Sequence, residues 1–162
     1  MFSVVVQVTK KAGLIALLFS WVFISSGFKL ILDDQDWLTW SNKLLSLTYD
    51  PSSEKKLKKW DISITSDAFL RIRKTYRNKK QVYYSLNLKD LKKVNYLGSA
   101  SKGTLQLKTK ADDIIVQTRN DRRGDLDKMA SELDIPVRHV GPGRLDSLKE
   151  ALNYFKGKSE SQ

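Results

Sequence analysis

The sequence predicts an α+β protein in which an N-terminal transmembrane helix precedes a small antiparallel β-barrel or curled sheet capped by C-terminal helices. Three observations predict this class. An apolar run fills residues 12–32, apolar and polar residues alternate between residues 60 and 119, and apolar residues recur at helical spacing after residue 122. With 162 residues, the chain has room for one domain and an anchor.

Residues 12–32 read AGLIALLFSWVFISSGFKLIL and carry one charge, Lys29, near their far end. A helix of this length spans about 30 Å, the thickness of a bilayer core, so we expect a retained anchor in segment 1–32. A cleaved signal peptide is the main alternative, because the small residues at 25–27 suit a cleavage site. A buried helix of a soluble domain is the third alternative. Against it, aromatic residues surround the helix on all sides and do not form one apolar stripe.

We expect the protein to be a single-pass protein of a bacterial inner membrane, but the side of its domain stays open. Lys10 and Lys11 precede the span while Asp33, Asp34 and Asp36 follow it, which favours a domain outside the cytoplasm. The domain itself is strongly basic, as the cytoplasmic parts of membrane proteins usually are.

Residues 33–59 are expected to form an amphipathic interfacial helix and a basic linker. In the helix, at 36–47, four apolar residues recur at helical spacing: Trp37, Trp40, Leu44 and Leu47. We assign Trp37 and Trp40 to the membrane interface, where indole rings gather beside a span. Packing of the same helix against the domain is the alternative.

Alternating apolar and polar side chains predict the strands of the next segment. The strands are expected near 68–76, 81–88, 94–97, 104–109 and 113–119. The first two join through a polar turn in one hairpin, and the last two join through residues 110–112 in another.

Two helices are expected to close the domain, at about 123–133 and 144–156. In the first, apolar residues share one face: Leu126, Met129, Ala130 and Leu133. Pro136 is expected to stop this helix. The domain then spans 60–156, and the polar residues 157–162 form a disordered tail.

The net charge of +11 is concentrated in the middle of the chain. Between Lys55 and Lys110 there are sixteen lysine and arginine residues against three acidic ones. Such a field attracts anionic lipids, nucleic acid or acidic proteins, whereas a solvated lysine surface only keeps a protein soluble. The candidate binding patch comprises the cations of the first hairpin: Arg71, Arg73, Lys74, Arg77, Lys79 and Lys80.

No constellation of residues indicates catalysis, so we expect a non-enzymatic protein without a metal or cofactor. The chain has no cysteine and a single histidine, His139, which removes thiolate chemistry and most transition-metal sites. Its glycines lack the spacing of a phosphate-binding loop. Tyrosines interleave with basic residues as in some nucleic-acid platforms, but the anchor argues against that partner.

Several stretches resemble one known family: ITSDAFLRIRKTYRNKK, LNLKDLKKVNY, GTLQLKT, DIIVQTR and RGDLDKMASEL. Together with the anchor they resemble the bacterial pleckstrin-homology-like (PH-like) membrane proteins, in which a strand meander ends in a capping helix. The resemblance covers roughly residues 60–133 and departs from the family pattern at Ala68, at Tyr76 and in the added helix 144–156. It implies a small PH-like barrel or curled sheet used for binding.

The expected function is a membrane-anchored binding module that recognises a membrane protein or an anionic lipid. In architecture alone, the chain also resembles prophage superinfection-exclusion proteins, which block phage DNA injection at the inner membrane. An assembly factor for an envelope complex is the third alternative.

We predict that the full-length protein stays in the membrane pellet during carbonate extraction, whereas a chain that begins at Asp33 does not. The reason is the apolar surface of residues 12–32, which is stable only in lipid. Immunoblots of pellet and supernatant measure the outcome. Release of the full chain would contradict the anchor, and a new N-terminus near Gly27 would indicate a cleaved signal instead.

Overall fold

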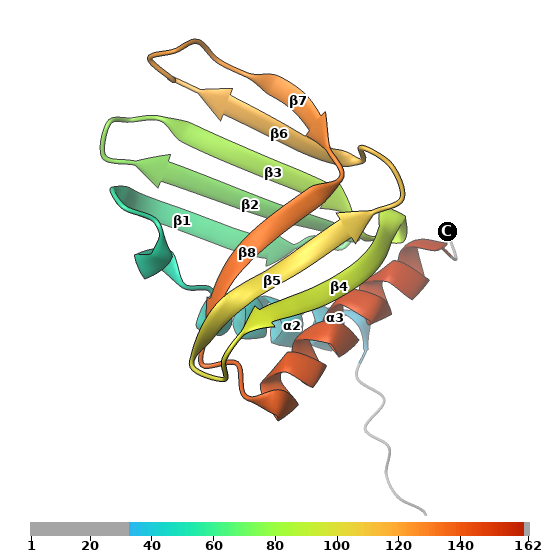
Figure 1. The fold of residues 1–162 in the computed structure, drawn as a ribbon. Coiled ribbons are helices and arrows are strands. Elements are labelled where there is room, and N and C mark those ends of the chain that lie inside the picture. Colours follow the sequence, from blue (N-terminus) through green and yellow to red (C-terminus); the bar gives the residue numbers. More distant parts are fainter. Residues whose placement is uncertain (1–32, 161–162) are drawn as a thin grey trace, which may run out of the picture. The chain divides into compact units, whose positions relative to one another are not determined.

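The computed structural model describes residues 33–160, which form two antiparallel sheets and two flanking helices (Figure 1). The expected membrane span at residues 12–32 lies outside the described residues. Within them, neither helix combines the length and the apolar character that crossing a bilayer requires. The α+β class is confirmed for this domain. A closed barrel is not, because the strands form two separate sheets.

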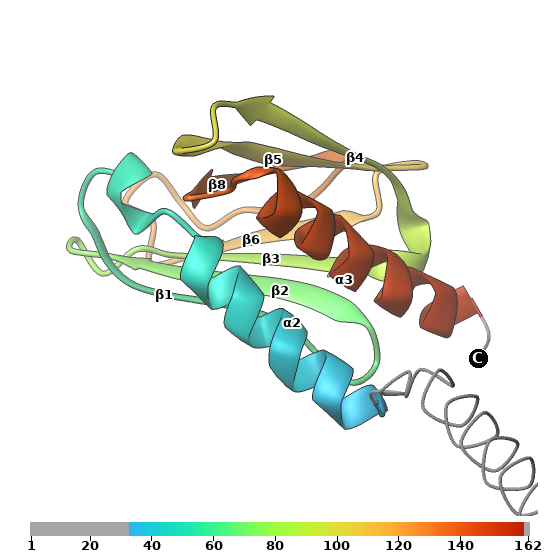
Figure 2. The same ribbon diagram turned by 90° about the horizontal axis from the view of Figure 1, so that it is seen from below.

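The elements follow one another from helix α2 to helix α3. In chain order they are α2 (Asp34–Thr48), η1 (Pro51–Ser53), β1 (Leu57–Ile64), β2 (Phe69–Tyr76), β3 (Gln81–Asn87), η2 (Leu88–Asp90), β4 (Leu91–Gly98), β5 (Lys102–Thr109), β6 (Ile114–Arg119), β7 (Asp127–Ala130), β8 (Glu132–Arg138) and α3 (Pro142–Glu160). The five-stranded sheet has the order β1-β2-β3-β6-β7, and the three-stranded sheet has the order β4-β5-β8. Seen from below, α2 and α3 lie next to each other on one side of the domain (Figure 2).

The two sheets share one hydrophobic core. Alternate residues of the larger sheet, such as Leu70 and Leu86, are fully buried in it. Leu105 and Leu107 contribute from the smaller sheet, and Phe155 contributes from α3. We call the side of the five-stranded sheet that faces this core its inner face, and the opposite side its outer face.

Of the two predicted hairpins, one is confirmed and one is wrong. β2 and β3 pair from Phe69 with Asn87 to Thr75 with Gln81, as the polar turn indicates. The strands at 104–109 and 113–119, however, belong to different sheets: β5 pairs with β4 and β8, and β6 pairs with β3 and β7. The reason is that alternation determines which side chains face the core, but not which strand lies beside which. For the same reason the chain is not a simple meander.

The helix predicted at 123–133 is wrong, because this segment forms β7 and the start of β8. Two residues of the expected buried face are exposed, Leu126 at 45% and Met129 at 51%. Burial follows a period of two instead, through Leu133, Ile135 and Val137. Pro136 therefore lies inside a strand, which is tolerated because β8 is an edge strand.

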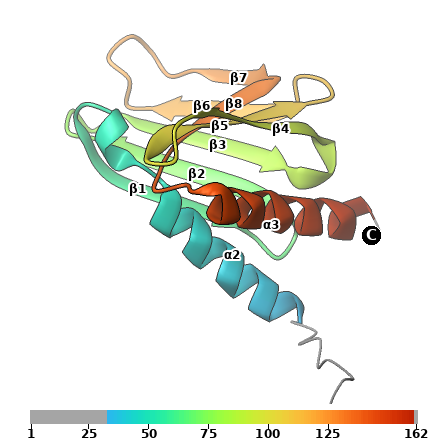
Figure 3. The ribbon, with the colours of Figure 1, turned by 60° about the horizontal axis from the view of Figure 1, so that its bottom comes forward.

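The predicted helices at 36–47 and 144–156 are confirmed as α2 and α3, each slightly longer than expected. α3 continues to Glu160, so residues 157–160 are helical rather than a disordered tail. In α2 the buried side is formed by Ser41, Leu45 and Thr48, and Leu47 is 57% exposed. Figure 3 shows both helices along the lower side of the domain.

Asn42 of α2 protects the edge of β1. Its side-chain amide donates to the carbonyl oxygen of Ile64 at 2.9 Å and accepts from the Ile64 N–H at 2.6 Å. The side chain therefore takes the place of a neighbouring strand at the end of β1. An edge strand otherwise leaves such backbone groups without partners.

We predict that Asn42→Ala lowers the free energy of unfolding by about 1–3 kcal/mol, because both backbone groups of Ile64 lose their partner. The measurement is urea unfolding of the detergent-solubilised full chain, followed by circular dichroism. The control is Lys43→Ala, an exposed neighbour on the same helix, which should change stability by less than about 0.5 kcal/mol. Equal effects of the two substitutions would show that the Asn42 contacts do not stabilise the edge.

Candidate anion-binding pocket

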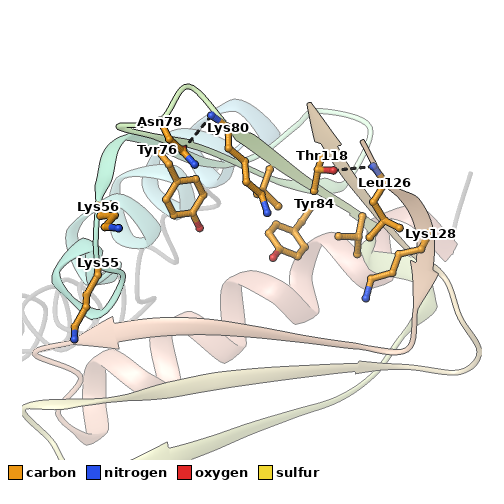
Figure 4. Close-up of a pocket in the computed structure, with 11 residues that line it drawn as sticks. Lys55, Lys56, Tyr76, Asn78, Lys80, Tyr84, Thr118, Leu126 and Lys128 are labelled. Carbon is orange, nitrogen blue, oxygen red and sulfur yellow. Dashed lines mark hydrogen bonds between the residues drawn. The ribbon is translucent and has the colours of Figure 1, made fainter. Parts of the chain in front are cut away.

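A pocket of about 480 Å³ opens on the inner face of the five-stranded sheet (Figure 4). Its floor consists of alternate residues of β3 and β6, among them the cross-strand neighbours Tyr84 and Val116. The next pair along the same face, Leu86 and Ile114, is fully buried in the core. The pocket is therefore the continuation of the core surface beyond the point where the core is covered.

Four lysines line this pocket: Lys55, Lys56, Lys80 and Lys128. Figure 4 shows Lys55 and Lys56 on one side, Lys128 on the other and Lys80 between them. The Lys80 ammonium lies 2.6 Å from a carboxylate oxygen of Asp121. Within residues 33–160, the other three lysines take part in no ion pair, so the pocket carries positive charge that the domain does not compensate.

Local backbone structure holds these lysines at the pocket. Lys56 adopts the left-handed conformation, with φ at 68°, and its carbonyl oxygen accepts from the N–H of Arg77 at 2.9 Å. This bond joins the segment before β1 to the turn between β2 and β3. In the same turn, the N–H of Lys80 donates to the side chain of Asn78 at 3.2 Å. Lys128 lies opposite Val116 on the neighbouring strand.

A polar cluster around Glu54 lies behind the pocket. The carboxylate of Glu54 accepts hydrogen bonds from Lys74 and Tyr76, and from the Tyr49 hydroxyl at 3.2 Å. Lys74 is only 5% exposed, and its ammonium also lies 5.2 Å from the ring centre of Tyr84. The Tyr49 ring lies 6.0 Å from the same ammonium, so one carboxylate and two aromatic faces surround the buried positive charge.

The cluster determines the protonation of its members. Burial opposes ionisation of Glu54, but hydrogen bonds from Lys74 and Tyr76, attraction to the Lys74 charge and the bond from Tyr49 together lower its pKa. Burial, followed by the negative charge of Glu54, raises the pKa of Tyr84. Tyr84 therefore keeps its proton at neutral pH. Its hydroxyl has no hydrogen-bond partner in the described part of the chain and remains a free donor beside the pocket.

The six residues of the patch predicted from the sequence do not form one surface. Because successive strand residues face opposite sides, Arg71 and Arg73 lie on the outer face while Lys74 faces inward. The two arginines stack over aromatic rings there, Arg71 over Phe69 and Arg73 over Tyr83.

The other members lie at the end of the hairpin. Arg77 and Lys79 are exposed in the turn, and only Lys80 lines the pocket. The other residues that line the pocket lie outside the predicted patch, among them Lys55, Lys56, Tyr76, Tyr84 and Lys128. Only strand pairing brings residues 55 and 128 together. The basic run at residues 55–59 is a feature of the sequence that could have pointed to Lys55 and Lys56.

Trp37 and Trp40 pack within the domain. The Trp37 ring stacks on Tyr154 of α3 with centroids 4.4 Å apart, and Trp40 meets it edge-on at 5.2 Å. Both indoles are half-buried. The structure thus shows the packing alternative, and their contact with a membrane interface stays a prediction.

The arrangement suits binding of an anion. His139 is exposed, does not line the pocket and has its N–H bonded to the carbonyl oxygen of Ser101 at 2.8 Å. In the described range, no three His, Asp or Glu side chains gather as a metal site would require. Comparisons with models of protein families, with curated proteins and with solved structures find no match for the chain.

We predict that acidification destabilises the domain through Glu54. Its pKa is lower in the folded chain than its ordinary value of 4.5, so the ionised group stabilises the fold above that pH. This contribution is lost as the pH falls through the folded pKa. Glu54→Gln should lower the free energy of unfolding at neutral pH by about 1–3 kcal/mol and reduce its dependence on acid. Thermal unfolding of the detergent-solubilised full chain, followed from neutral pH down to pH values below the folded pKa of Glu54, measures both effects.

The matched control is Glu54→Gln combined with Lys74→Met, which removes the buried charge as well. This double variant should recover stability, because the cost of the single variant comes from an uncompensated ammonium. If the double variant is no more stable than Glu54→Gln alone, the ion pair does not hold the cluster.

Proposed function

We propose that the protein is a membrane-anchored, non-enzymatic binding module whose lysine-lined pocket binds the phosphate-bearing headgroup of an anionic lipid. One observation carries the proposal. Lys55, Lys56 and Lys128 surround a concave site without any ion pair among the residues described. Like charges gathered in this way repel one another, and an anion bound between them relieves the repulsion.

The composition of the pocket supports a phosphate-bearing ligand. Its volume of about 480 Å³ lies within the range of small-ligand sites. Lysine ammonium groups bind phosphate as point charges, and the protonated Tyr84 hydroxyl supplies a directed hydrogen bond. Val82 and Val116 give the floor an apolar surface that suits the glycerol and upper acyl part of a lipid.

Two expectations from the sequence favour a lipid over a free anion. A membrane anchor at residues 12–32 would keep the domain beside headgroups. The resemblance to PH-like membrane proteins also remains a proposal. Two antiparallel sheets and a C-terminal helix support it in outline, whereas the pairing of β3 with β6 departs from a simple meander.

We predict that the full chain, purified in a non-ionic detergent, binds dihexanoyl-phosphatidylglycerol and does not bind dihexanoyl-phosphatidylcholine. Replacing Lys55, Lys56 and Lys128 with glutamine should weaken binding at least about tenfold, because charge-assisted hydrogen bonds contribute about 1.5–3 kcal/mol each. Tyr84→Phe should weaken it by about threefold to tenfold. Isothermal titration calorimetry measures each affinity, and inorganic phosphate serves as the probe for a free anion.

Two triple variants with the same loss of charge separate the pocket from a general basic field. Glutamine at Lys43, Lys58 and Lys110, which are exposed elsewhere, should leave the affinity within about twofold. Glutamine at Arg71, Arg73 and Arg77 tests the patch that the sequence predicts. A larger loss in either variant than in the pocket variant would contradict the proposed site. Equal affinities for phosphate and phosphatidylglycerol would show that the ligand is a free anion.

A further inference from the structure

The strand β4 presents an open sheet edge. It is the outermost strand of the three-stranded sheet and pairs only with β5 among the described elements. The other long edges are each covered at one end: β1 by Asn42 at Ile64, and β8 by the bridge between Tyr49 and Val137. With eight residues, β4 is long enough to pair with another extended segment.

A groove of about 260 Å³ lies between this edge and α3. The residues that line it come from β4 and from α3. Figure 1 shows α3 running beside β4. Leu91 and Val94 supply apolar surface, and Asn153 supplies an amide. A groove between an unpaired strand edge and a helix is suited to a peptide that adds as one more strand.

Lysines line both walls of the groove. Lys92 and Lys93 come from β4, and Lys149 and Lys156 come from α3. None of the four takes part in an ion pair within residues 33–160. Two exposed acidic residues of α3, Asp146 and Glu150, line the neighbouring surface beside Trp37, which shares Lys149 and Asn153 with the groove. Neither acidic residue lines the groove itself.

Protection of the strand edge does not explain this arrangement. Lysines on an edge strand discourage unwanted pairing, and this purpose accounts for Lys92 and Lys93. It does not account for Lys149 and Lys156, which lie two helical turns apart on α3 and bring their charges to the same groove. Two elements distant in sequence therefore converge on one positively charged site.

We propose that this groove binds an acidic peptide segment of another protein, which adds to β4 as an extended strand. Backbone hydrogen bonds to the open edge provide affinity, and carboxylates of the peptide meet the four lysines. Pairing between two copies of this chain fits less well. It brings the lysine pairs of β4 close to each other, and facing like charges destabilise a sheet.

The test uses a fluorescein-labelled decapeptide in which glutamate alternates with threonine. Its binding to the detergent-solubilised full chain is measured by fluorescence anisotropy at low ionic strength. Two further peptides are methylated on the backbone nitrogens of all glutamates or of all threonines. An added strand forms hydrogen bonds to its neighbour through the N–H groups of alternate residues only. One of the two methylated peptides should therefore bind at least tenfold more weakly than the unmethylated peptide, and the other should bind with nearly the same affinity. Equal binding of both series would overturn strand addition.

Charge variants locate the site. Glutamine at Lys93, Lys149 and Lys156 should weaken peptide binding at least tenfold. Glutamine at Lys55, Lys56 and Lys128 removes the same charge from the pocket and should leave peptide binding within twofold. This control keeps the groove proposal independent of the pocket proposal. A larger loss in the pocket variant would overturn the groove, as would equally tight binding of a single-stranded oligonucleotide of the same charge. A chain dimer that the peptide fails to dissociate would also overturn it.

Discussion

The ion pair between Glu54 and Lys74 is the interaction on which the rest of the domain most depends. Lys74 is almost completely buried, and without Glu54 its charge would have no anionic partner. The same carboxylate binds Tyr49 at the end of α2 and Tyr76 at the end of β2. Since Tyr49 also bridges to Val137 of β8, one ionised side chain connects a helix and both sheets. The polar cluster next to the pocket, which includes Tyr76, therefore depends on a single buried charge pair.

This pair also separates the positive charge of the core from that of the pocket. Glu54 compensates Lys74, so the uncompensated charge at the pocket comes from rim lysines that are free to meet a ligand. Tyr84 belongs to both environments. Its ring lies 5.2 Å from the buried ammonium, and its hydroxyl lies beside the pocket without a partner in the described chain. A ligand that bonds this hydroxyl would therefore act directly on the packing that supports Lys74.

Periodicity in the sequence predicted the α+β class, both flanking helices and the β2–β3 hairpin, because each depends on contacts close in sequence. It failed for residues 123–133, where Leu126, Met129 and Leu133 recur at helical spacing although the segment forms strands. There the pairing of Met129 with Ile115, a contact distant in sequence, decided in favour of a strand. The sequence also does not predict which sheet each strand joins. Alternation determines which face of a sheet a side chain is on, but not which strand lies next to it. The predicted patch failed as one surface for a more local reason: in a strand, adjacent Arg73 and Lys74 face opposite sides.

The distribution of ion pairs bears on whether the basic middle segment could bind a ligand or only keeps the protein soluble. Several cations of the basic middle segment form ion pairs within the domain, as in Lys80 with Asp121, Lys102 with Asp50 and Lys108 with Glu132. A solubilising surface would spread the remaining lysines over convex, solvated regions. Seven of the lysines without ion pairs in the described range line two concave sites, the pocket and the groove, whereas others, such as Lys43, Lys58 and Lys110, are exposed elsewhere. Concave walls focus the field of such charges, and their mutual repulsion costs stability unless an anion is bound. The seven lysines of these two sites thus lie where a bound anion would gain most from their charge.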